Sequence, residues 1–199
     1  MIPLHRLVDL SIGLSILGWA VAGALQHHGE RPLAVLLATS LLHLTVGVLF
    51  LVRWRKARQG DFRSCAIAIP AVLIGGWVFN LAPDRWGVPS QVLFVSGSVL
   101  AVASFIFLGR CFSILPAVRG VVTRGPFSYV RHPAYLGELA MVVACIAAAP
   151  MHWTLMILPA VVLGCFIARI RVEERLLMAE KSYREYCLRV RWRLMPLIW

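Results

Sequence analysis

The run GPFSYVRHPAYLGE (residues 125–138) joins a basic, loop-like segment to an apolar one. A proline is tolerated in the first turn of a helix, because its missing N–H has no intrahelical partner there. Pro133 therefore predicts the start of a membrane helix, with Arg131 and His132 at its lip. Glu138 follows in the next turn, where a carboxylate in hydrocarbon needs a partner or a water-filled cavity. Free backbone N–H groups at a helix start also favour an anion, so this run is a candidate functional site.

The composition indicates an integral membrane protein. Of the 199 residues, 60% are hydrophobic and 15% are charged, and the mean hydropathy is +0.79. A soluble domain of this size could not bury so much apolar surface. The net charge of +11 does not predict nucleic-acid binding, because the basic residues lie between apolar segments, where topology explains them first. The five cysteines include no C-x-x-C pair and no ligand spacing, so we expect no metal.

Six apolar segments predict an all-α helix bundle. They cover residues 8–25, 33–52, 65–81, 90–108, 133–149 and 153–170. Most approach the roughly 20 residues that a helix needs to cross the hydrocarbon core. We expect residues 1–108 to form a scaffold of four helices. Residues 109–199 would form the functional part, with a cytosolic loop, a helical hairpin at 133–170 and a C-terminal cytosolic helix.

The loop charges predict the orientation of the chain. All of the 20 Lys and Arg residues except Arg31 and Arg85 fall on one side of a six-span arrangement. By the positive-inside rule this side is cytoplasmic, so both termini are expected in the cytoplasm. Arg6 and the apolar run up to Ala22-Gly23-Ala24 also resemble a signal peptide with its cleavage site. We expect this segment to be retained as an anchor instead.

Two segments on the predicted cytosolic side are expected to be more than simple linkers, and the first, at 109–131, is too apolar for a solvated one. The loop at 109–131 is long, and loops of this length tend to be functional covers or binding elements. Beyond Glu174, apolar residues recur at helical spacing with Arg and Glu between them. We expect helix six to extend into the cytosol and an amphipathic helix to follow, ending before Pro196 and docking at the membrane surface. The charges from Arg184 to Arg193 are expected to form a solvated face next to anionic lipid.

The short connection around Met151 determines how the last two segments are arranged. Segments five and six are separated by only a few residues, so they form an antiparallel hairpin. The start of segment five then lies beside the end of segment six. Arg131, His132 and Tyr135 would meet the Glu173-Glu174 pair at one level on the cytosolic side. Topology thus unites two polar clusters that are far apart in the sequence.

Three motifs carry a resemblance to a known family. The run at 125–138, followed by EERLL (173–177) and YREY (183–186), resembles the isoprenylcysteine carboxyl methyltransferases and the related phospholipid methyltransferases. These are integral membrane enzymes that use S-adenosylmethionine, and the resemblance covers about residues 104–196. It implies catalytic roles for Arg131 and Glu174. The cofactor-binding residues that it implies are His132, Tyr135, Gly137, Glu173 and Glu174, with Glu138 and Tyr129 as further candidates.

The chemistry of that cofactor suits these residue types. S-adenosylmethionine presents a sulfonium, an ammonium and a carboxylate, so a site with Arg, His and Glu can bind it zwitterion to zwitterion. Methyl transfer then needs in-line positioning and exclusion of water. Arg131 could hold the carboxylate of the cofactor or that of the acceptor, and both remain open. The resemblance implies a lipophilic acceptor at the cytosolic membrane face, with an isoprenylcysteine carboxylate ahead of a phospholipid amine, a small thiol or another lipophilic acid.

Two other functions fit parts of the pattern. Membrane reductases of the sterol type, which use NADPH, share an R-H-P-x-Y-x-G-E run. The residue after the proline is typically Asn in those enzymes, and Ala134 here favours the methyltransferase, whereas Glu138 matches the reductases. A non-catalytic membrane protein that binds a lipid or a partner through the hairpin is the second alternative. The clustering of acids and bases at one level argues against it.

Each site residue also has a structural explanation of its own. Arg131 suits a positive-inside anchor, and Tyr135 suits an interfacial aromatic. Glu173-Glu174 would form salt bridges with Arg169 and Arg171. Their occurrence together, in this order and topology, favours the cofactor site.

Overall fold

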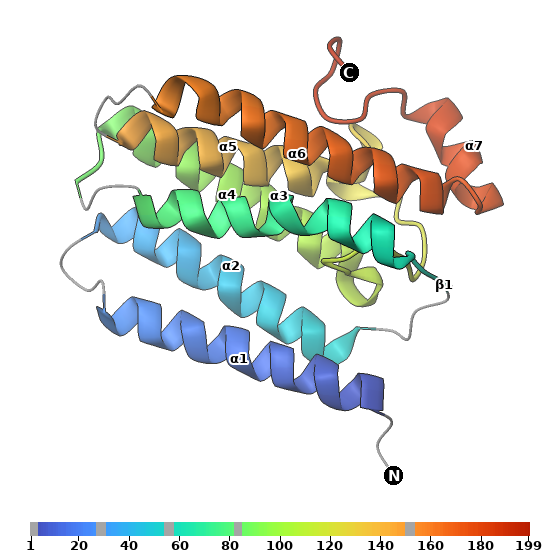
Figure 1. Cartoon of the computed structure of the whole chain (residues 1–199), viewed down its shortest axis with the longest axis horizontal. Helices are drawn as coiled ribbons and strands as arrows, with labels where there is room; N and C mark the ends of the chain where they lie inside the picture. Colours follow the sequence, from blue (N-terminus) through green and yellow to red (C-terminus); the bar gives the residue numbers. More distant parts are fainter. Residues whose placement is uncertain (1–3, 27–30, 54–57, 82–84, 150–153) are drawn as a thin grey trace.

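The computed structural model describes residues 4–26, 31–53, 58–81, 85–149 and 154–199, so the predicted connection around Met151 lies outside the described residues. The helices in this part of the chain are α1 (Leu4–Gln26), α2 (Leu33–Val52), α3 (Phe62–Leu81), α4 (Val88–Leu108), α5 (Pro133–Ala148), α6 (Thr154–Leu177) and α7 (Lys181–Arg189). Helices α1 to α6 lie lengthwise side by side, and α7 lies beyond one end of α6 (Figure 1). The predicted all-α class is confirmed.

Four helices of the described chain are long and apolar enough to cross a membrane. These stretches are Arg6–Gly23, Leu33–Val52, Phe62–Phe79 and Val88–Cys111. Helix α5 is apolar but has only 16 residues, and α6 carries charged residues in its last turns. The protein is therefore an integral membrane protein, and the count of six spans stays a prediction. Large aliphatic side chains point outward along α1 to α4, as expected of helices that face lipid.

The segment between α4 and α5 is folded rather than a plain loop. It contains two short 3₁₀ helices, η1 (Gly109–Cys111) and η2 (Gly125–Ser128), and the strand β2 (Ala117–Val118). Strand β2 pairs antiparallel with β1 (Arg58–Gln59), which ties this segment to the chain just before α3. Gly125 enters η2 with φ 63°, and a Cβ there would lie 2.5 Å from the Phe107 ring. Glycine is required at this turn for both reasons.

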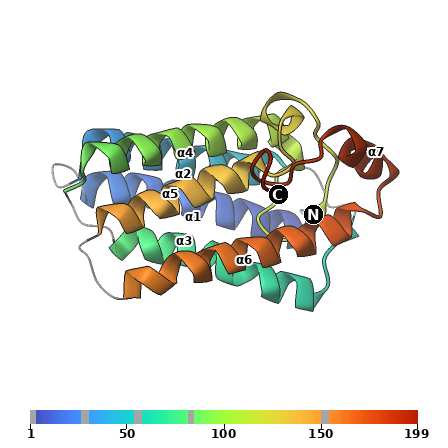
Figure 2. The same ribbon diagram turned by 90° about the horizontal axis from the view of Figure 1, so that it is seen from above.

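Helices α4 and α5 contact each other through their backbones. A Cβ built on Gly137 would lie 2.5 Å from the carbonyl oxygen of Gly97 and 2.7 Å from the backbone nitrogen of Ala101. Small residues at such crossings let membrane helices approach closely enough for van der Waals attraction to hold them. Helix α5 consequently packs more extensively on α4 than on α6. Figure 2 shows α5 between these two helices, so the predicted hairpin partner is only one of its neighbours.

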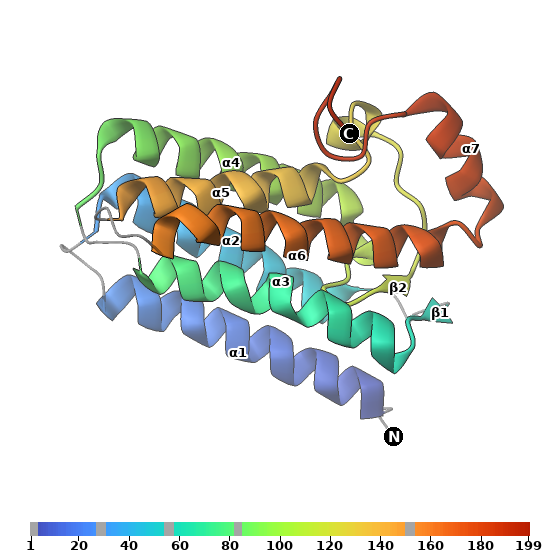
Figure 3. The ribbon, with the colours of Figure 1, turned by 45° about the horizontal axis from the view of Figure 1, so that its top comes forward.

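The predicted amphipathic helix exists, but its apolar face lies inside the protein. Helix α7 ends at Arg189, and Tyr183 and Tyr186 are buried against Phe127 of η2. These two tyrosines therefore pack on η2 and not on lipid, and docking of this stretch at the membrane surface stays a prediction. After α7 the chain turns back toward the bundle and ends near the start of α5 (Figure 3).

The α4–α5 contact yields a stability prediction. Gly137→Ala places a methyl group against backbone atoms of α4 that cannot move aside, and we expect a loss of about 1–3 kcal/mol in unfolding free energy. The measurement is the thermal unfolding midpoint of the detergent-purified protein. Gly164→Ala on α6 is the matched control, because no atom lies within 4 Å of its added Cβ. Equal midpoints for the two variants would contradict the backbone contact.

Candidate functional site

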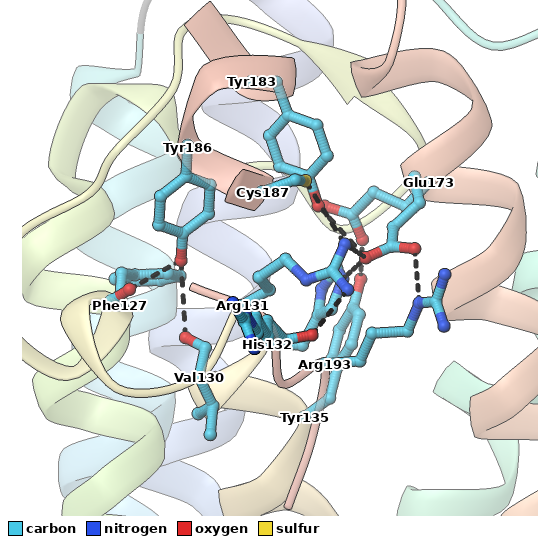
Figure 4. A network of polar contacts seen from close by, with 12 residues as sticks. Phe127, Val130, Arg131, His132, Tyr135, Glu173, Tyr183, Tyr186, Cys187 and Arg193 are labelled. Carbon is cyan, nitrogen blue, oxygen red and sulfur yellow. Dashed lines mark hydrogen bonds and ion pairs between the residues drawn. The ribbon is translucent and has the colours of Figure 1, made fainter. Parts of the chain in front are cut away.

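The start of α5 and the end of α6 meet at one end of the bundle. His132 Nε2 lies 3.3 Å from Glu174 Oε1, and the Tyr135 hydroxyl donates a hydrogen bond to Glu173 Oε2. The segment before α5 and the last turns of α6 therefore lie side by side, as the predicted antiparallel arrangement requires. Figure 4 shows Arg131, His132 and Tyr135 converging with Glu173 on one space. The two distant clusters of the sequence form a single polar network.

Glu174 is the centre of this network and is only 5% exposed. Arg131 Nη1 lies 2.9 Å from Oε1, and Arg193 Nε donates to Oε2 at 2.6 Å. The Tyr183 hydroxyl also donates to Oε1, at 3.3 Å. Hydrogen bonds between charged groups are the strong kind, and here they come from the residues before α5 and from the last residues of the chain. A single carboxylate thus links the start of α5, helix α7 and the last residues of the chain.

These contacts fix the protonation states around Glu174. Burial by itself raises the pKa of the Glu174 carboxyl, but hydrogen bonds from His132 and Arg193 and the charges of His132 and Arg131 outweigh it and lower the pKa to about 2. Burial and the nearby carboxylate raise the pKa of the Tyr183 hydroxyl, so that it stays protonated and donates. Near neutral pH the site therefore presents a buried carboxylate that is ionised.

The last residues of the chain, 190–199, form a strap that holds the Arg131-His132 pair. The backbone N–H of Arg131 donates to Trp192 O at 2.9 Å, and that of His132 donates to Arg193 O at 2.8 Å. Arg131 Nη2 also donates to Arg191 O at 2.9 Å. The sequence placed Arg184 to Arg193 on a solvated face. Arg193 is an exception that periodicity could not reveal, because it lies in irregular chain beyond α7.

A second buried pair lies deeper in the bundle. Arg169 is only 4% exposed, and its Nη1 lies 3.3 Å from Glu138 Oε2. Its Nη2 donates to Ile114 O at 3.0 Å, and its guanidinium lies over the Tyr135 ring, 4.4 Å from the centroid. Glu138 thus has the partner that a carboxylate at this depth requires. From the sequence, Arg169 is predicted only as a salt-bridge partner of Glu173-Glu174. Nothing in the sequence indicates its hydrogen bond to Ile114 O in the 109–131 segment.

Three aromatic side chains support the site from its sides. The rings of His132 and Tyr135 stack with centroids 5.5 Å apart and planes 5° apart. The Tyr186 hydroxyl donates to Phe127 O at 2.6 Å, which holds η2 against α7. The YREY motif was the sequence signal for Tyr183 and Tyr186, although their partners could not be read from it.

Two of the predicted site residues lie elsewhere. Tyr129 is 76% exposed and does not face the network. Gly137 faces α4, where it makes the backbone contact with Gly97. The structure therefore gathers Arg131, His132, Tyr135 and the Glu173-Glu174 pair, and it gives Gly137 a packing contact.

An elongated cavity of about 780 Å³ runs from the network into the bundle. On α5 its lining follows one helical face, with residues Tyr135, Glu138, Met141, Val142 and Cys145. These positions span about 15 Å at 1.5 Å per residue. Tyr183 and Tyr186 line the end near the network, and apolar side chains such as Leu42 and Val46 of α2 line the deeper part. The cavity thus combines a polar mouth with an apolar interior.

The fold and this site define an integral membrane protein that brings an ionised cluster to the mouth of an apolar cavity. The profile of the family described as phospholipid methyltransferase matches residues 88–185, and the chain belongs to this family of membrane methyltransferases. The matched residues run from the start of α4 into α7, so they include the site residues described above except Tyr186 and Arg193. No curated protein sequence matches this chain significantly. The family favours methyl transfer over the reductase alternative.

The pKa of Glu174 yields a prediction about pH. Because its folded value of about 2 lies below the ordinary value of 4.5, its stabilisation is fully present above pH 4.5 and is lost as the pH falls toward 2. We expect Glu174→Gln to unfold at a lower temperature than the wild type at neutral pH. The gap should shrink as the pH falls below 4.5. The measurement is a thermal unfolding series against pH.

Glu185→Gln is the matched control for that series. Glu185 lies on α7 with a side chain 60% exposed, paired with Lys181 at 3.8 Å. Exposed pairs of this kind contribute little, so its unfolding midpoint should follow the wild type at every pH. A gap for Glu174→Gln that stays constant with pH would contradict the depressed pKa.

Proposed function

We propose that this protein is an S-adenosylmethionine-dependent methyltransferase that acts on a lipophilic acceptor at the cytosolic membrane face. The observation that carries the proposal is the polar end of the cavity, where Arg131 and His132 line the space and pair behind it with the buried, ionised Glu174. Membership of a family of membrane methyltransferases supports it. Both termini are cytoplasmic in this proposal, because the basic loops gather at the end that carries the site.

The residues of the site fit the groups of this cofactor. Glu174 would receive the ammonium in exchange for one of its present donors, because a carboxylate and a cationic donor form a strong, charge-assisted hydrogen bond. Arg131 would receive a carboxylate, and its Nε has no hydrogen-bond partner within the described chain. Tyr183 and Tyr186 line the same end of the cavity and offer aromatic faces to an adenine ring or a sulfonium.

When bound, S-adenosylmethionine supplies a methyl group already activated on a sulfonium. What remains for the protein is to align the acceptor with that methyl group and to exclude water. The Tyr135 side chain is fixed for this purpose, because its hydroxyl bonds Glu173 and its ring stacks on His132. The 109–131 segment, tied down through Ile114 and Arg169, would cover the site. The acceptor would enter sideways from the bilayer into the apolar part of the cavity.

A carboxylate acceptor of the isoprenylcysteine type is the first choice. It is already ionised at neutral pH, so its methylation requires no general base, and an arginine can orient it bidentately. A phospholipid amine is the second candidate, favoured by the carboxylates of Glu138 and Glu173 that line the cavity. An amine must lose a proton during methylation, and a carboxylate within reach could accept it. The two acceptors therefore make different demands on the same cavity.

Cofactor binding tests the proposed function most directly. We expect S-adenosylmethionine and S-adenosylhomocysteine, but not NADPH, to bind the detergent-purified protein in calorimetry. Glu174→Gln should weaken this binding by about 1.5–3 kcal/mol, because it removes the charged partner of the ammonium. Glu185→Gln should bind as the wild type does. Binding of NADPH alone would overturn the proposal in favour of a reductase, and unchanged affinity in Glu174→Gln would remove its assigned role.

Methyl transfer to defined acceptors gives the second test. With labelled S-adenosylmethionine, we expect transfer to a prenylated cysteine acid to exceed transfer to phosphatidylethanolamine. His132→Ala should lose this activity while its far-UV circular dichroism stays that of a folded helical protein, because His132 orients both Glu174 and Tyr135. A fully active His132→Ala variant would show that the residue only borders the site. Transfer to the phospholipid alone would establish the second candidate.

A further inference from the structure

The chain ends in a tight turn whose outer side is apolar. The backbone N–H groups of Arg193 and Leu194 both donate to Trp199 O, at 2.8 and 3.0 Å, and that of Trp199 donates to Met195 O at 3.2 Å. The turn is therefore closed by its own hydrogen bonds. Residues 195–198, which we call the apolar tip, form its outer part.

The turn is fixed on one side and exposed on the other. Leu194 is 3% exposed and belongs to the main hydrophobic core, against which Trp199 also packs. Leu197 is 85% exposed and Ile198 is 73% exposed. Leu197 also has φ 68°, a left-handed conformation that costs a residue with a side chain roughly 1–2 kcal/mol. A rigid, strained turn thus presents two large aliphatic side chains to its surroundings.

The position of the apolar tip along the bundle indicates which environment Leu197 and Ile198 face. The strap pairs with Arg131 and His132, the two residues before the apolar helix α5. Figures 1 and 3 show the chain returning from α7 so that its end lies at the flank of the bundle, near the start of α5. We expect α5 to cross the hydrocarbon core, so its start would lie at the boundary between the hydrocarbon and the headgroups.

The charges near the tip suit the same boundary. Arg189, the last residue of α7, and Arg191, on the strap just before the tip, are both exposed. Each basic residue close to a leaflet that contains anionic lipid contributes about 1 kcal/mol of attraction. Aliphatic side chains set beside arginines are the composition of an interfacial anchor.

We propose that the apolar tip inserts into the interface of the leaflet beside the site, with the flanking arginines on anionic headgroups. Insertion removes Leu197 and Ile198 from water, which offsets the cost of the left-handed turn. It also holds the strap in place, and the strap carries Arg193, whose Nε bonds Glu174 at 2.6 Å. The inference rests on the membrane location of the bundle and not on the proposed methyl transfer.

Lipid contact at the tip can be measured directly with the whole 199-residue chain. A fluorescent unnatural residue replaces Ile198 in one variant and Leu188 in the other, in nanodiscs of phosphatidylcholine with phosphatidylglycerol. Leu188 is the matched control, because it is 79% exposed on α7, beyond the end of the bundle. We expect spin-labelled lipids to quench the probe at 198 strongly and the probe at 188 weakly, and aqueous iodide to do the reverse. Omitting phosphatidylglycerol should reduce the lipid quenching at 198.

Two outcomes would overturn the proposal. If iodide quenches the probe at 198 as well as the probe at 188, the tip is in water. If neither quencher reaches the probe at 198, the tip is covered by protein, such as a second copy of the chain. These readouts need no cofactor, so they stand whether or not the protein transfers methyl groups.

A second measurement uses unlabelled protein. Leu197→Ser combined with Ile198→Ser should speed tryptic cleavage at Arg191 and Arg193 in the same nanodiscs, because the strap loses its hold on the membrane. Leu188→Ser should leave cleavage at these sites unchanged. Equal cleavage in the double variant and the wild type, with equal unfolding midpoints, would contradict the anchor.

Discussion

The ion pairs of Glu174 are the interaction on which the rest of the site depends. A carboxylate with only 5% exposure is tolerable only where its charge is matched, because removing a charge from water costs several kcal/mol. Arg131, His132 and Arg193 supply that match from three directions. Each of these side chains therefore has to lie next to the Glu174 carboxylate. The helix hairpin, the 109–131 segment and the strap position them there.

The backbone contact between α4 and α5 fixes one end of this arrangement. Gly97 and Gly137 let the two helices approach until a side chain on either would clash with the other backbone. Helix α5 is thereby held on α4, so that His132, just before the helix, and Tyr135, in its first turn, lie at a defined height. Helix α6, which packs on α3 and α5, brings Glu173-Glu174 to the same height. A rigid scaffold thus positions the charged groups more accurately than a loop would.

The cavity has a charged end and a largely apolar remainder, as the headgroups and the hydrocarbon of a bilayer are charged and apolar. At its mouth the charges neutralise one another, and deeper in the bundle the buried Glu138 is paired with Arg169. Beyond this pair most lining residues are apolar, although Arg31, Thr39, Ser40 and His43 also line it, so a hydrocarbon chain would lie mainly against apolar side chains. The proposed cofactor and acceptor would accordingly meet where the two environments adjoin.

The sequence by itself determined the class of the protein and most of its site. Hydropathy identified the helices, because a membrane requires long apolar stretches, and Pro133 marked the first residue of α5. The short connection around Met151 predicted that Arg131 and His132 meet Glu173-Glu174, since a hairpin leaves the chain no other arrangement.

Only the tertiary structure decided which groups complete the network and which face elsewhere. Arg193 reaches Glu174 through irregular chain, which has no periodicity for a sequence pattern to reveal. Tyr129 belongs to the motif at 125–138 but is exposed, whereas Phe127 and Val130 on either side of it are buried. Gly137 belongs to the motif, yet in the structure its missing side chain lets α4 approach closely. Which helix makes such a close contact depends on tertiary packing and not on the local sequence.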